Sequence, residues 1–178
     1  MIDWKNKVIK AVDEKPPSEN SLNQAPGSRS DFDLIDNPSD RLDPLSLKPA
    51  SVIVGIVDGD IPQLFLTKRS DQLEQHSGQI AFPGGKVEEG ESFTEAAIRE
   101  AEEEVGLTLP DYEICGYLDT YETGTGYRIL PVVVFIKSDF IPQIDVNEVA
   151  ETFKVPFEFL MDSKNHQLQS AEWKGMVR

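Results

Sequence analysis

The chain has 178 residues, of which 39% are hydrophobic and 28% charged, so it is long enough for one domain with a buried core. Its formal net charge of −15 repels nucleic-acid backbones and anionic membranes, which argues against a non-specific nucleic-acid binder or a membrane-surface protein. The single cysteine, Cys115, excludes an internal disulfide, and the absence of a long apolar run or a signal-like start leads us to expect a cytoplasmic location.

The first 48 residues predict a short helix followed by a polar arm. Four apolar residues have helical spacing within residues 1–12. The segment after them is rich in Pro, Ser, Asn and Asp, which is typical of a loosely ordered chain. We therefore divide the chain into an N-terminal helix and arm, residues 1–48, and a compact domain, residues 49–178.

From residue 49 onward the pattern indicates β-strands. Residues 51–57 and 63–67 are apolar runs separated by Asp58-Gly59-Asp60, a sequence typical of a hairpin turn. Residues 147–155 fit no single type, and Pro156 is expected to open a short helix. Strands and helices do not alternate regularly, which favours an α+β fold or a layered mixed sheet. Three more strands are predicted at 79–82, 113–121 and 129–136.

A helix is predicted at residues 92–105, with the glycine after it as its C-terminal stop. At 100° per residue, Glu100, Glu103 and Glu104 share one face. Glu102 lies on the other side and is expected to be solvated. Like charges one turn apart destabilise a helix, so the acidic face is either solvated or bound to a divalent cation, for which carboxylates are suitable ligands. The Gly-Gly turn before the helix and the arginine inside it favour the cation.

The segment that contains this helix resembles the Nudix box. The box requires Gly, five residues, Glu, seven residues, Arg-Glu, an apolar residue, any residue, Glu-Glu, any residue, Gly and an apolar residue. The chain reads GKVEEGESFTEAAIREAEEEVGL from residue 85 to residue 107, and every fixed position matches, with Ala101 in the first apolar position. The resemblance implies an α-β-α sandwich with a mixed sheet, in which the box forms a loop, a helix and a loop.

Membership of the Nudix family would also imply a reaction. Such proteins hydrolyse a diphosphate linked to another moiety, usually a nucleoside derivative, with Mg²⁺ or Mn²⁺ as the cofactor. Glu91 and Arg99 are implied to orient the metal ligands through a salt bridge, and with Glu103 and Glu104 they form the expected catalytic set. The implied metal ligands are the carboxylates of Glu100, Glu103 and Glu104 and the carbonyl of Gly85.

The residue that accepts the proton from the attacking water differs among Nudix proteins, so the box alone does not identify it. Inside the box, Glu103 and Glu104 are candidates. Outside it, Glu148 and Glu151 are candidates, because the segment after the last long strand often supplies this residue in the family. The alternative for the second pair is that both are exposed loop acids.

A second resemblance precedes the box and runs into it. The stretch FLTKRSDQLEQHSGQIAFPGG is similar to the signature of the coenzyme A pyrophosphatase branch of the family. Two positions differ, because Phe65 replaces a Leu and Glu74 replaces an Arg that would pair with a phosphate. Arg69, Lys68 or His76 would then have to supply that contact. The matching positions are Thr67, Arg69, Ser70, Gly78, Phe82, Pro83, Gly84 and Gly85, of which Arg69, Ser70, Gly84 and Gly85 are the expected substrate-binding residues.

Together the two resemblances predict a small-molecule hydrolase that converts coenzyme A or its derivatives to 3′,5′-ADP and 4′-phosphopantetheine or its acyl form. The reversed charge at Glu74 keeps a second substrate class open, such as ADP-ribose or a dinucleotide. A non-catalytic Nudix-fold binding module and an acidic protein-interaction domain are the alternatives from other classes. The TGTGYR segment is either a flexible hairpin loop or a substrate contact through Tyr127 or Arg128. Because Nudix proteins usually continue beyond the short helix with another strand and a closing helix, we expect the C-terminal end of the domain to be incomplete.

Overall fold

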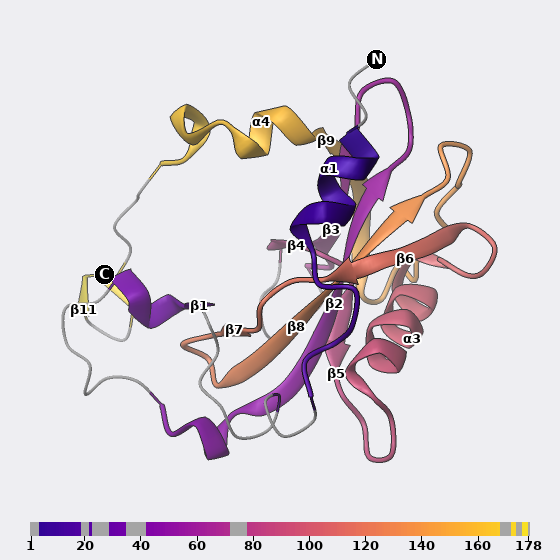
Figure 1. The fold of residues 1–178 in the computed structure, drawn as a ribbon. Helices are drawn as coiled ribbons and strands as arrows, with labels where there is room; N and C mark the ends of the chain where they lie inside the picture. Colours follow the sequence, from indigo (N-terminus) through magenta and orange to yellow (C-terminus); the bar gives the residue numbers. More distant parts are fainter. Residues whose placement is uncertain are drawn as a thin grey trace.

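A mixed β-sheet forms the centre of the molecule and carries helices on both faces (Figure 1). The computed structural model describes residues 4–18, 22, 29–34, 42–71, 78–167, 172–173 and 176–177. Within them the sheet contains β1 (Arg29–Ser30), β2 (Lys48–Val57), β3 (Gln63–Arg69), β4 (Ile80–Ala81), β5 (Gly84–Lys86), β6 (Tyr112–Tyr117), β7 (Tyr121–Glu122), β8 (Tyr127–Ile136) and β9 (Val149–Pro156). The α-helices are α1 (Trp4–Ala11), α3 (Phe93–Val105) and α4 (Phe157–Met161), the 3-10 helices are η1 (Asp31–Leu34), η3 (Pro44–Ser46) and η4 (Ser163–Asn165), and β10 (Glu172–Trp173) pairs with β11 (Met176–Val177).

The two long strands β2 and β8 run parallel at the centre of the sheet, in register from Lys48 opposite Tyr127 to Val57 opposite Ile136. β2 also pairs antiparallel with β3 and β5, and β3 pairs antiparallel with β4 and β9. β8 pairs antiparallel with β6 and β7. Both long strands contain continuous apolar runs because both faces of the sheet are covered. The observed sheet is mixed, and the predicted α+β class is confirmed.

Alternate residues of β2 and β8 face two separate apolar cores. On one face, Ile53 and Val132 belong to the core under α3, which contributes Ala97, Ala101 and Val105. On the other face a smaller core lies under α1 and α4. The order of layers is therefore helix, sheet, helix, as in the expected sandwich. The smaller core includes Ile56, Leu64, Val133 and Phe135 from the sheet and Trp4, Val8, Phe157 and Leu160 from the helices.

The N-terminal helix α1 packs on the sheet. The Trp4 ring meets the Phe135 ring edge-on, with centroids 5.4 Å apart and an angle of 88° between the planes. After the helix, the backbones of Asp13 and Tyr117 exchange two hydrogen bonds of 2.9 Å. The predicted helix near the N-terminus is thus present and contributes to the second core. The domain boundary at residue 48 stays a prediction.

The edge of the sheet near β6 differs from the sequence prediction. Instead of one strand over residues 113–121, the chain forms β6 and β7 with an interruption between them. The pairing of β6 with β8 shifts register between Ile114 and Gly116, and the Val12 side chain and the Asp13 carbonyl oxygen lie directly against Gly116. This close approach of the segment after α1 explains why β6 bends and ends early.

Neither β9 nor β5 is predicted from the sequence. Residues 147–155 had no single assignment, and the structure shows β9 paired with β3 from Gln63 opposite Pro156 to Arg69 opposite Val149. α4 follows at once, one residue after the proline expected to open it. The Gly-Gly segment, read as a turn, forms β5 because its backbone pairs with that of β2.

Some sequence-based expectations fall outside the described residues. These include the Glu74 position, where the coenzyme A signature has an arginine, and His76. None of the helices in the part of the chain that the structure describes is long and apolar enough to cross a membrane.

Candidate metal and active site

A glycine pair on β5 forms one wall of the site. Gly84 has a φ of 152°, and a Cβ there would collide with the backbones of Ser51 and Val52 on β2. A Cβ on Gly85 would collide with the carboxylate of Glu100. Glycine at both positions therefore allows β5 to lie close to β2 on one side and to the acidic face of α3 on the other.

Both ends of helix α3, which carries the acidic face, are capped. The Ser92 hydroxyl accepts a hydrogen bond from the Glu95 N–H, and the Glu95 carboxylate accepts one from the Ser92 N–H. At the other end Gly106 adopts the left-handed conformation, with a φ of 69°, and its N–H donates to the Glu102 carbonyl. The predicted helix and its glycine stop are confirmed.

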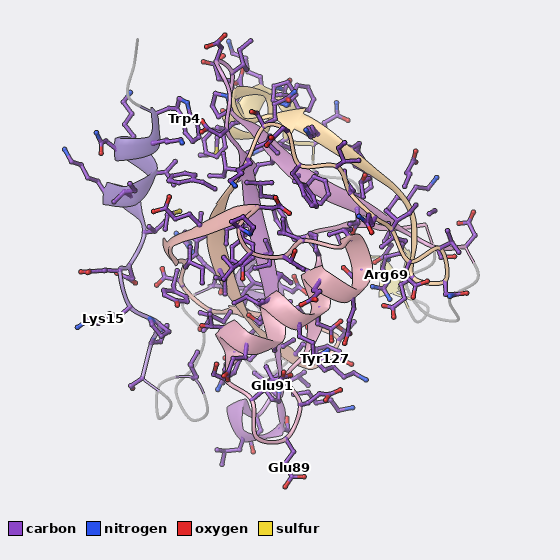
Figure 2. All side chains as sticks on the ribbon, turned by 90° about the vertical axis from the view of Figure 1, so that its right-hand side faces the viewer. Trp4, Lys15, Arg69, Glu89, Glu91 and Tyr127 are labelled. Atoms are coloured by element: carbon purple, nitrogen blue, oxygen red, sulfur yellow. The ribbon has the colours of Figure 1, made fainter. Side chains whose placement is uncertain are left out.

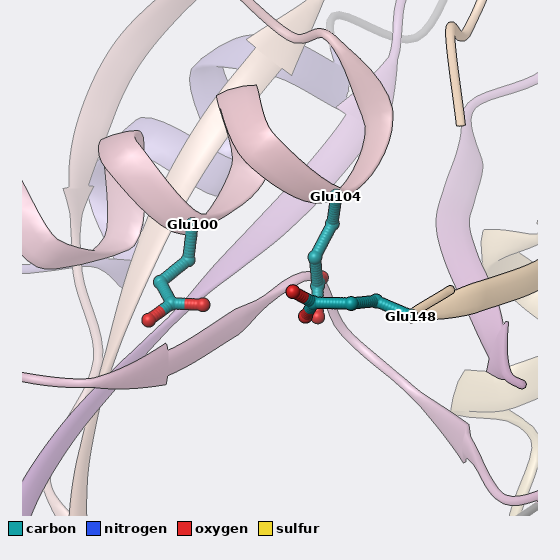
Figure 3. Close-up of side chains that lie close together, drawn as sticks. All are labelled: Glu100, Glu104 and Glu148. Carbon is teal, nitrogen blue, oxygen red and sulfur yellow. The ribbon is translucent and has the colours of Figure 1, made fainter. Parts of the chain in front are cut away.

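Three carboxylates converge beside the glycine pair. Glu100 and Glu104 project from successive turns of α3, and Glu148 reaches toward them from the turn before β9 (Figure 3). One oxygen from each of the three lies within 4.8 Å of the others. Glu104 is buried, whereas Glu100 and Glu148 are half-buried. Such a cluster of hard oxygen donors suits a divalent cation of the Mg²⁺ or Mn²⁺ type.

Strand pairing explains how Glu148, which lies 44 positions after Glu104 in the numbering, reaches this cluster. β9 pairs with β3, and the Ser70 N–H, just after β3, donates a 2.8 Å hydrogen bond to the Glu148 carbonyl. On the other side, the Asp145 N–H donates to the Glu104 carbonyl at 3.0 Å. The turn that carries Glu148 is therefore attached both to β3 and to the end of α3.

Burial raises the pKa values of two of these carboxyl groups. The pKa of Glu104 rises to about 7, mainly because the group is removed from water, although the Gly84 N–H and the Arg69 guanidinium oppose that change. Burial likewise raises the pKa of Glu100, against the effect of Arg99. A bound cation would favour the ionised form of both groups, so their environment fits a metal site.

A hollow of about 480 Å³ lies beside these groups. Among the described residues, three cationic side chains and five carboxylates line it, which gives a formal charge of −2. This excess of negative charge would repel a diphosphate substrate unless a cation were bound. The charged lining residues are Arg69, Lys86, Arg99, Glu88, Glu100, Glu103, Glu104 and Glu148.

Arg99 connects the loop of the box to the acidic face of α3. It makes two hydrogen bonds to the Glu91 carboxylate, from Nε at 3.0 Å and from Nη2 at 2.8 Å. Its Nη1 donates to Glu100 at 3.0 Å and to Glu103 at 3.2 Å, and its Nη2 also donates to the Lys86 carbonyl. The hydrogen bonds from Arg99 lower the pKa of Glu91. The expected ion pair between Glu91 and Arg99 is therefore present, and it fixes the Glu100 side chain.

Glu103 and Glu151 occupy different positions from the three converging carboxylates. The Glu103 side chain is 56% exposed, pairs with Arg99 and lines the hollow, but it is not part of the 4.8 Å group. The Glu151 side chain is 60% exposed and pairs with Lys68 at 3.5 Å. The other acids of the box segment face water, as expected for Glu102, and Glu89 points away from the molecule at the tip of the loop (Figure 2). These exposed acids are Glu88, Glu89, Glu95 and Glu102.

The expected substrate-binding residues also surround the hollow. Gly84, Gly85 and Arg69 line it, and Ser70 is buried next to Arg69. Nη1 of Arg69 lies 3.7 Å from Oε1 of Glu104, whereas Arg99 pairs with Glu100 and Glu103. Residues of the segment before the box thus contribute to the same site as the box, which the sequence alone did not show.

The TGTGYR segment is a braced turn and does not supply its arginine to the hollow. Arg128 is 2% exposed and donates to the Glu122 carboxylate at 3.1 Å and to the Leu22 carbonyl at 2.6 Å. Asp31 accepts hydrogen bonds from the Gly124 N–H and the Tyr121 hydroxyl. Sequence reasoning offered Arg128 as a substrate contact, but its buried ion pair accounts for its position in the fold.

The sequence profile of the NUDIX domain matches residues 47–173, which include every residue of the site described above. The chain belongs to the Nudix family. A Nudix relative from Shigella flexneri serotype 5b (strain 8401), named uncharacterized Nudix hydrolase NudL, is 40% identical over 128 residues, or 71% of this chain and 66% of the relative. A relative of the same name from Enterobacter sp. (strain 638) is 38% identical over 141 residues, or 78% of this chain and 73% of the relative. This chain thus spans about two thirds of the length of the relative from Shigella flexneri.

Solved structures show the same Nudix fold. A binary complex of the Ap4A hydrolase from C. elegans matches with a TM-score of 0.55 and 21% identity, over 67% of this chain and 88% of that one. The Nudix hydrolase RenU from M. smegmatis matches with a TM-score of 0.54 and 20% identity, over 65% of this chain and 74% of that one. At this level of identity the likeness establishes the architecture, and the layers described above are those of a Nudix domain.

Proposed function

We propose that the protein is a divalent-cation-dependent Nudix hydrolase that cleaves the diphosphate linkage of coenzyme A or its derivatives. The observation that carries this proposal is the convergence of Glu100, Glu104 and Glu148 in a hollow that Arg69 also enters. The family match and the names of the relatives support hydrolysis of a diphosphate. The expected products are 3′,5′-ADP and 4′-phosphopantetheine, or its acyl form.

Some residues of the hollow bind the cation, and others position the residues that bind it. We assign Glu100, Glu104 and the Gly85 carbonyl to the binding of Mg²⁺ or Mn²⁺. Glu148 lies beside them and has a separate role, given below. A bound cation would neutralise the diphosphate and lower the pKa of a water molecule. Arg99, braced by Glu91, keeps Glu100 directed at the hollow, and the close contact between β5 and α3 limits the motion of both.

Among the candidates for the proton acceptor, we favour Glu148. A general base must lie within hydrogen-bonding reach of the water that it activates. Glu148 lies beside the other carboxylates and comes from a different element, so it approaches the hollow from another side. Glu103 is held by Arg99 at the exposed edge, and Glu151 is paired with Lys68 outside the lining of the hollow.

The segment before the box supports coenzyme A as the substrate. Its signature residues are not scattered over the surface, since Arg69, Gly84 and Gly85 line the hollow. Ser70 is buried and holds the Glu148 turn through its backbone. In this arrangement the signature contributes both a cation for a phosphate and the support for the proposed base.

A substrate panel tests the proposal. Coenzyme A, acetyl-coenzyme A, NADH, ADP-ribose and diadenosine polyphosphates are compared at fixed Mg²⁺ and Mn²⁺, and phosphate-containing products are identified by mass spectrometry. We expect coenzyme A or its acetyl form to give the highest kcat/KM and to yield 3′,5′-ADP. A wide margin for ADP-ribose or a dinucleotide would overturn the substrate assignment, and binding of these compounds without turnover would identify a non-catalytic module.

A further inference from the structure

Among the described residues, few groups pair with the Arg69 side chain. Its Nε is buried and has no hydrogen-bond partner within the part of the chain that the structure describes. Its ion pair with Glu104 is long, at 3.7 Å, which is beyond hydrogen-bonding distance. A guanidinium group offers five N–H donors in a rigid plane, and a buried donor without a partner lowers stability. Among the described residues, the side chain is therefore held near Glu104 by charge, without hydrogen bonds that would fix its orientation.

Arg99, which also lines the hollow, differs from Arg69 in its hydrogen bonds. Arg99 uses Nε, Nη1 and Nη2 in five hydrogen bonds to three carboxylates and a backbone carbonyl. That network lies within the box and leaves Arg99 few donors for a ligand. Arg69 stands on β3, outside the box, and its Nε–H, which has no partner among the described residues, is available to an incoming anion.

Glu104 is the group for which Arg69 and a divalent cation would compete. Its side chain is 4% exposed and, within the described residues, pairs with the Gly84 N–H on Oε2 at 3.1 Å and with Arg69 near Oε1. Oε1 is thus the oxygen that has only a loose charge partner. A carboxylate oxygen bound to a divalent cation no longer requires a guanidinium as its counter-ion.

We propose that Arg69 is a counter-ion that is transferred from Glu104 to the substrate. Without a divalent cation, Arg69 balances the charge of Glu104. Once Glu104 binds the cation, the Arg69 guanidinium turns its donors, including the buried Nε–H, to an anionic oxygen of the diphosphate. The identity of the anion in this inference rests on the proposed function. The competition between Arg69 and a cation at Glu104 does not.

The transfer predicts opposite effects of one substitution on two ligands. Removal of the Arg69 charge should strengthen binding of the cation alone, because a competing positive charge is lost. The same substitution should weaken binding of a diphosphate in the presence of the cation, because its charge-assisted hydrogen bonds are lost. A residue that merely supported the fold would weaken both.

The experiment compares Arg69→Gln with Lys68→Gln, a change of the same charge at the adjacent β3 position, whose side chain pairs with exposed Glu151. Mn²⁺ affinity without substrate is measured by electron paramagnetic resonance, and binding of α,β-methylene-ADP with saturating Mn²⁺ by calorimetry. For Arg69→Gln we expect Mn²⁺ to bind about 5- to 20-fold more tightly and the analogue about 10-fold more weakly. For Lys68→Gln we expect both affinities to stay within about twofold, as for other exposed pairs.

Further outcomes decide against the transfer. Unchanged or weaker Mn²⁺ binding in Arg69→Gln would overturn it, and so would tighter Mn²⁺ binding with unchanged analogue binding. Arg69→Lys keeps the charge, so it should bind Mn²⁺ within about twofold of the wild type, and tighter binding there would indicate rearrangement of the site instead. Circular dichroism verifies that each variant is folded. The Mn²⁺ measurement needs no turnover, so it stays informative even if the substrate panel shows no hydrolysis.

Discussion

At the scale of single residues, Glu148 and Glu151 provide a direct comparison. Both are acids of the same segment, but Glu148 lies with Glu100 and Glu104, whereas Glu151 pairs with Lys68 near the surface. We expect Glu148→Gln to lower kcat by about 100-fold or more, as for the loss of a general base, and Glu151→Gln to change it less than about twofold. Steady-state kinetics at saturating Mg²⁺ measures both. Equal losses in the two variants would contradict the placement of the base.

Gly85 gives a second prediction at this scale. An alanine there would push against the Glu100 carboxylate and displace it from the hollow. Gly85→Ala should therefore weaken Mn²⁺ binding by about 10-fold, in line with the effect of disturbed support around metal ligands. Gly59→Ala is the matched control, because its Cβ would meet only the Ile61 carbonyl at an ordinary 3.7 Å. Mn²⁺ binding that is unchanged in Gly85→Ala would show that the glycine does not protect the Glu100 position.

The sequence predicted the residues of the box better than their orientation. The helical spacing of 100° per residue placed Glu100, Glu103 and Glu104 on one face. The helix and its ends were predictable because they depend on local residues. Helical spacing does not show where the opposing strand lies. In the structure β5 faces Glu100 and Glu104, so Glu104 is buried and Glu103 turns toward Arg99 and water.

At the scale of elements, helix α3 carries an electrostatic cost when no cation is bound. The pKa of Glu104 is raised to about 7 by burial, above the ordinary value of 4.5. The folded state therefore keeps a proton that the unfolded state has lost, and the stability due to this group is present below pH 4.5 and lost as the pH rises through 7. We expect the free energy of unfolding of chelated protein to fall between pH 5 and pH 7.5.

Urea unfolding of the wild type and of Glu104→Gln measures this effect. The amide resembles the protonated acid, so the variant should lack this part of the pH dependence. Added Mg²⁺ should restore the stability of the wild type at pH 7.5 and have a smaller effect on the variant. Parallel pH curves for the two proteins would show that Glu104 is not the group responsible.

Helix α1 supports the opposite face of the sheet. Trp4 packs edge-on against Phe135 and belongs to the second core, whereas Ile9 of the same helix is 48% exposed. Trp4→Ala should lower the free energy of unfolding by about 2 kcal/mol, and Ile9→Ala by less than about 0.5 kcal/mol. Urea unfolding in the presence of Mg²⁺ gives both values. Similar small losses would mean that α1 contributes little to the stability of the sheet.

At the scale of the whole molecule, the site is assembled from three distant parts of the chain. Arg69 ends β3, the box supplies β5 and α3, and Glu148 precedes β9. The pairing of β9 with β3 brings the last of these to the first. Local patterns predicted β2, β3, β8 and α3, but neither β9 nor its pairing with β3, because residues 147–155 have no clear strand pattern. For the same reason the sequence could not choose between Glu148 and Glu151.

The polar TGTGYR loop illustrates a second limit of sequence reasoning. It reads as a solvated turn, yet Arg128 is buried in an ion pair with Glu122 and holds the Leu22 carbonyl of the N-terminal arm. This pair is buried because the N-terminal arm lies beside β7. No local sequence pattern predicts that contact. The fold class and the box were thus predictable, whereas contacts between distant segments were not.

The most direct test of the account is hydrolysis of coenzyme A by the wild type and by Glu104→Gln over a titration of Mg²⁺ into chelated protein. The wild type should show no turnover without Mg²⁺ and should release 3′,5′-ADP and 4′-phosphopantetheine as Mg²⁺ is added. Glu104→Gln, although folded, should lose at least about 100-fold in kcat/KM. Turnover of coenzyme A that is independent of Mg²⁺, or that is equal in the two proteins, would contradict the proposed site.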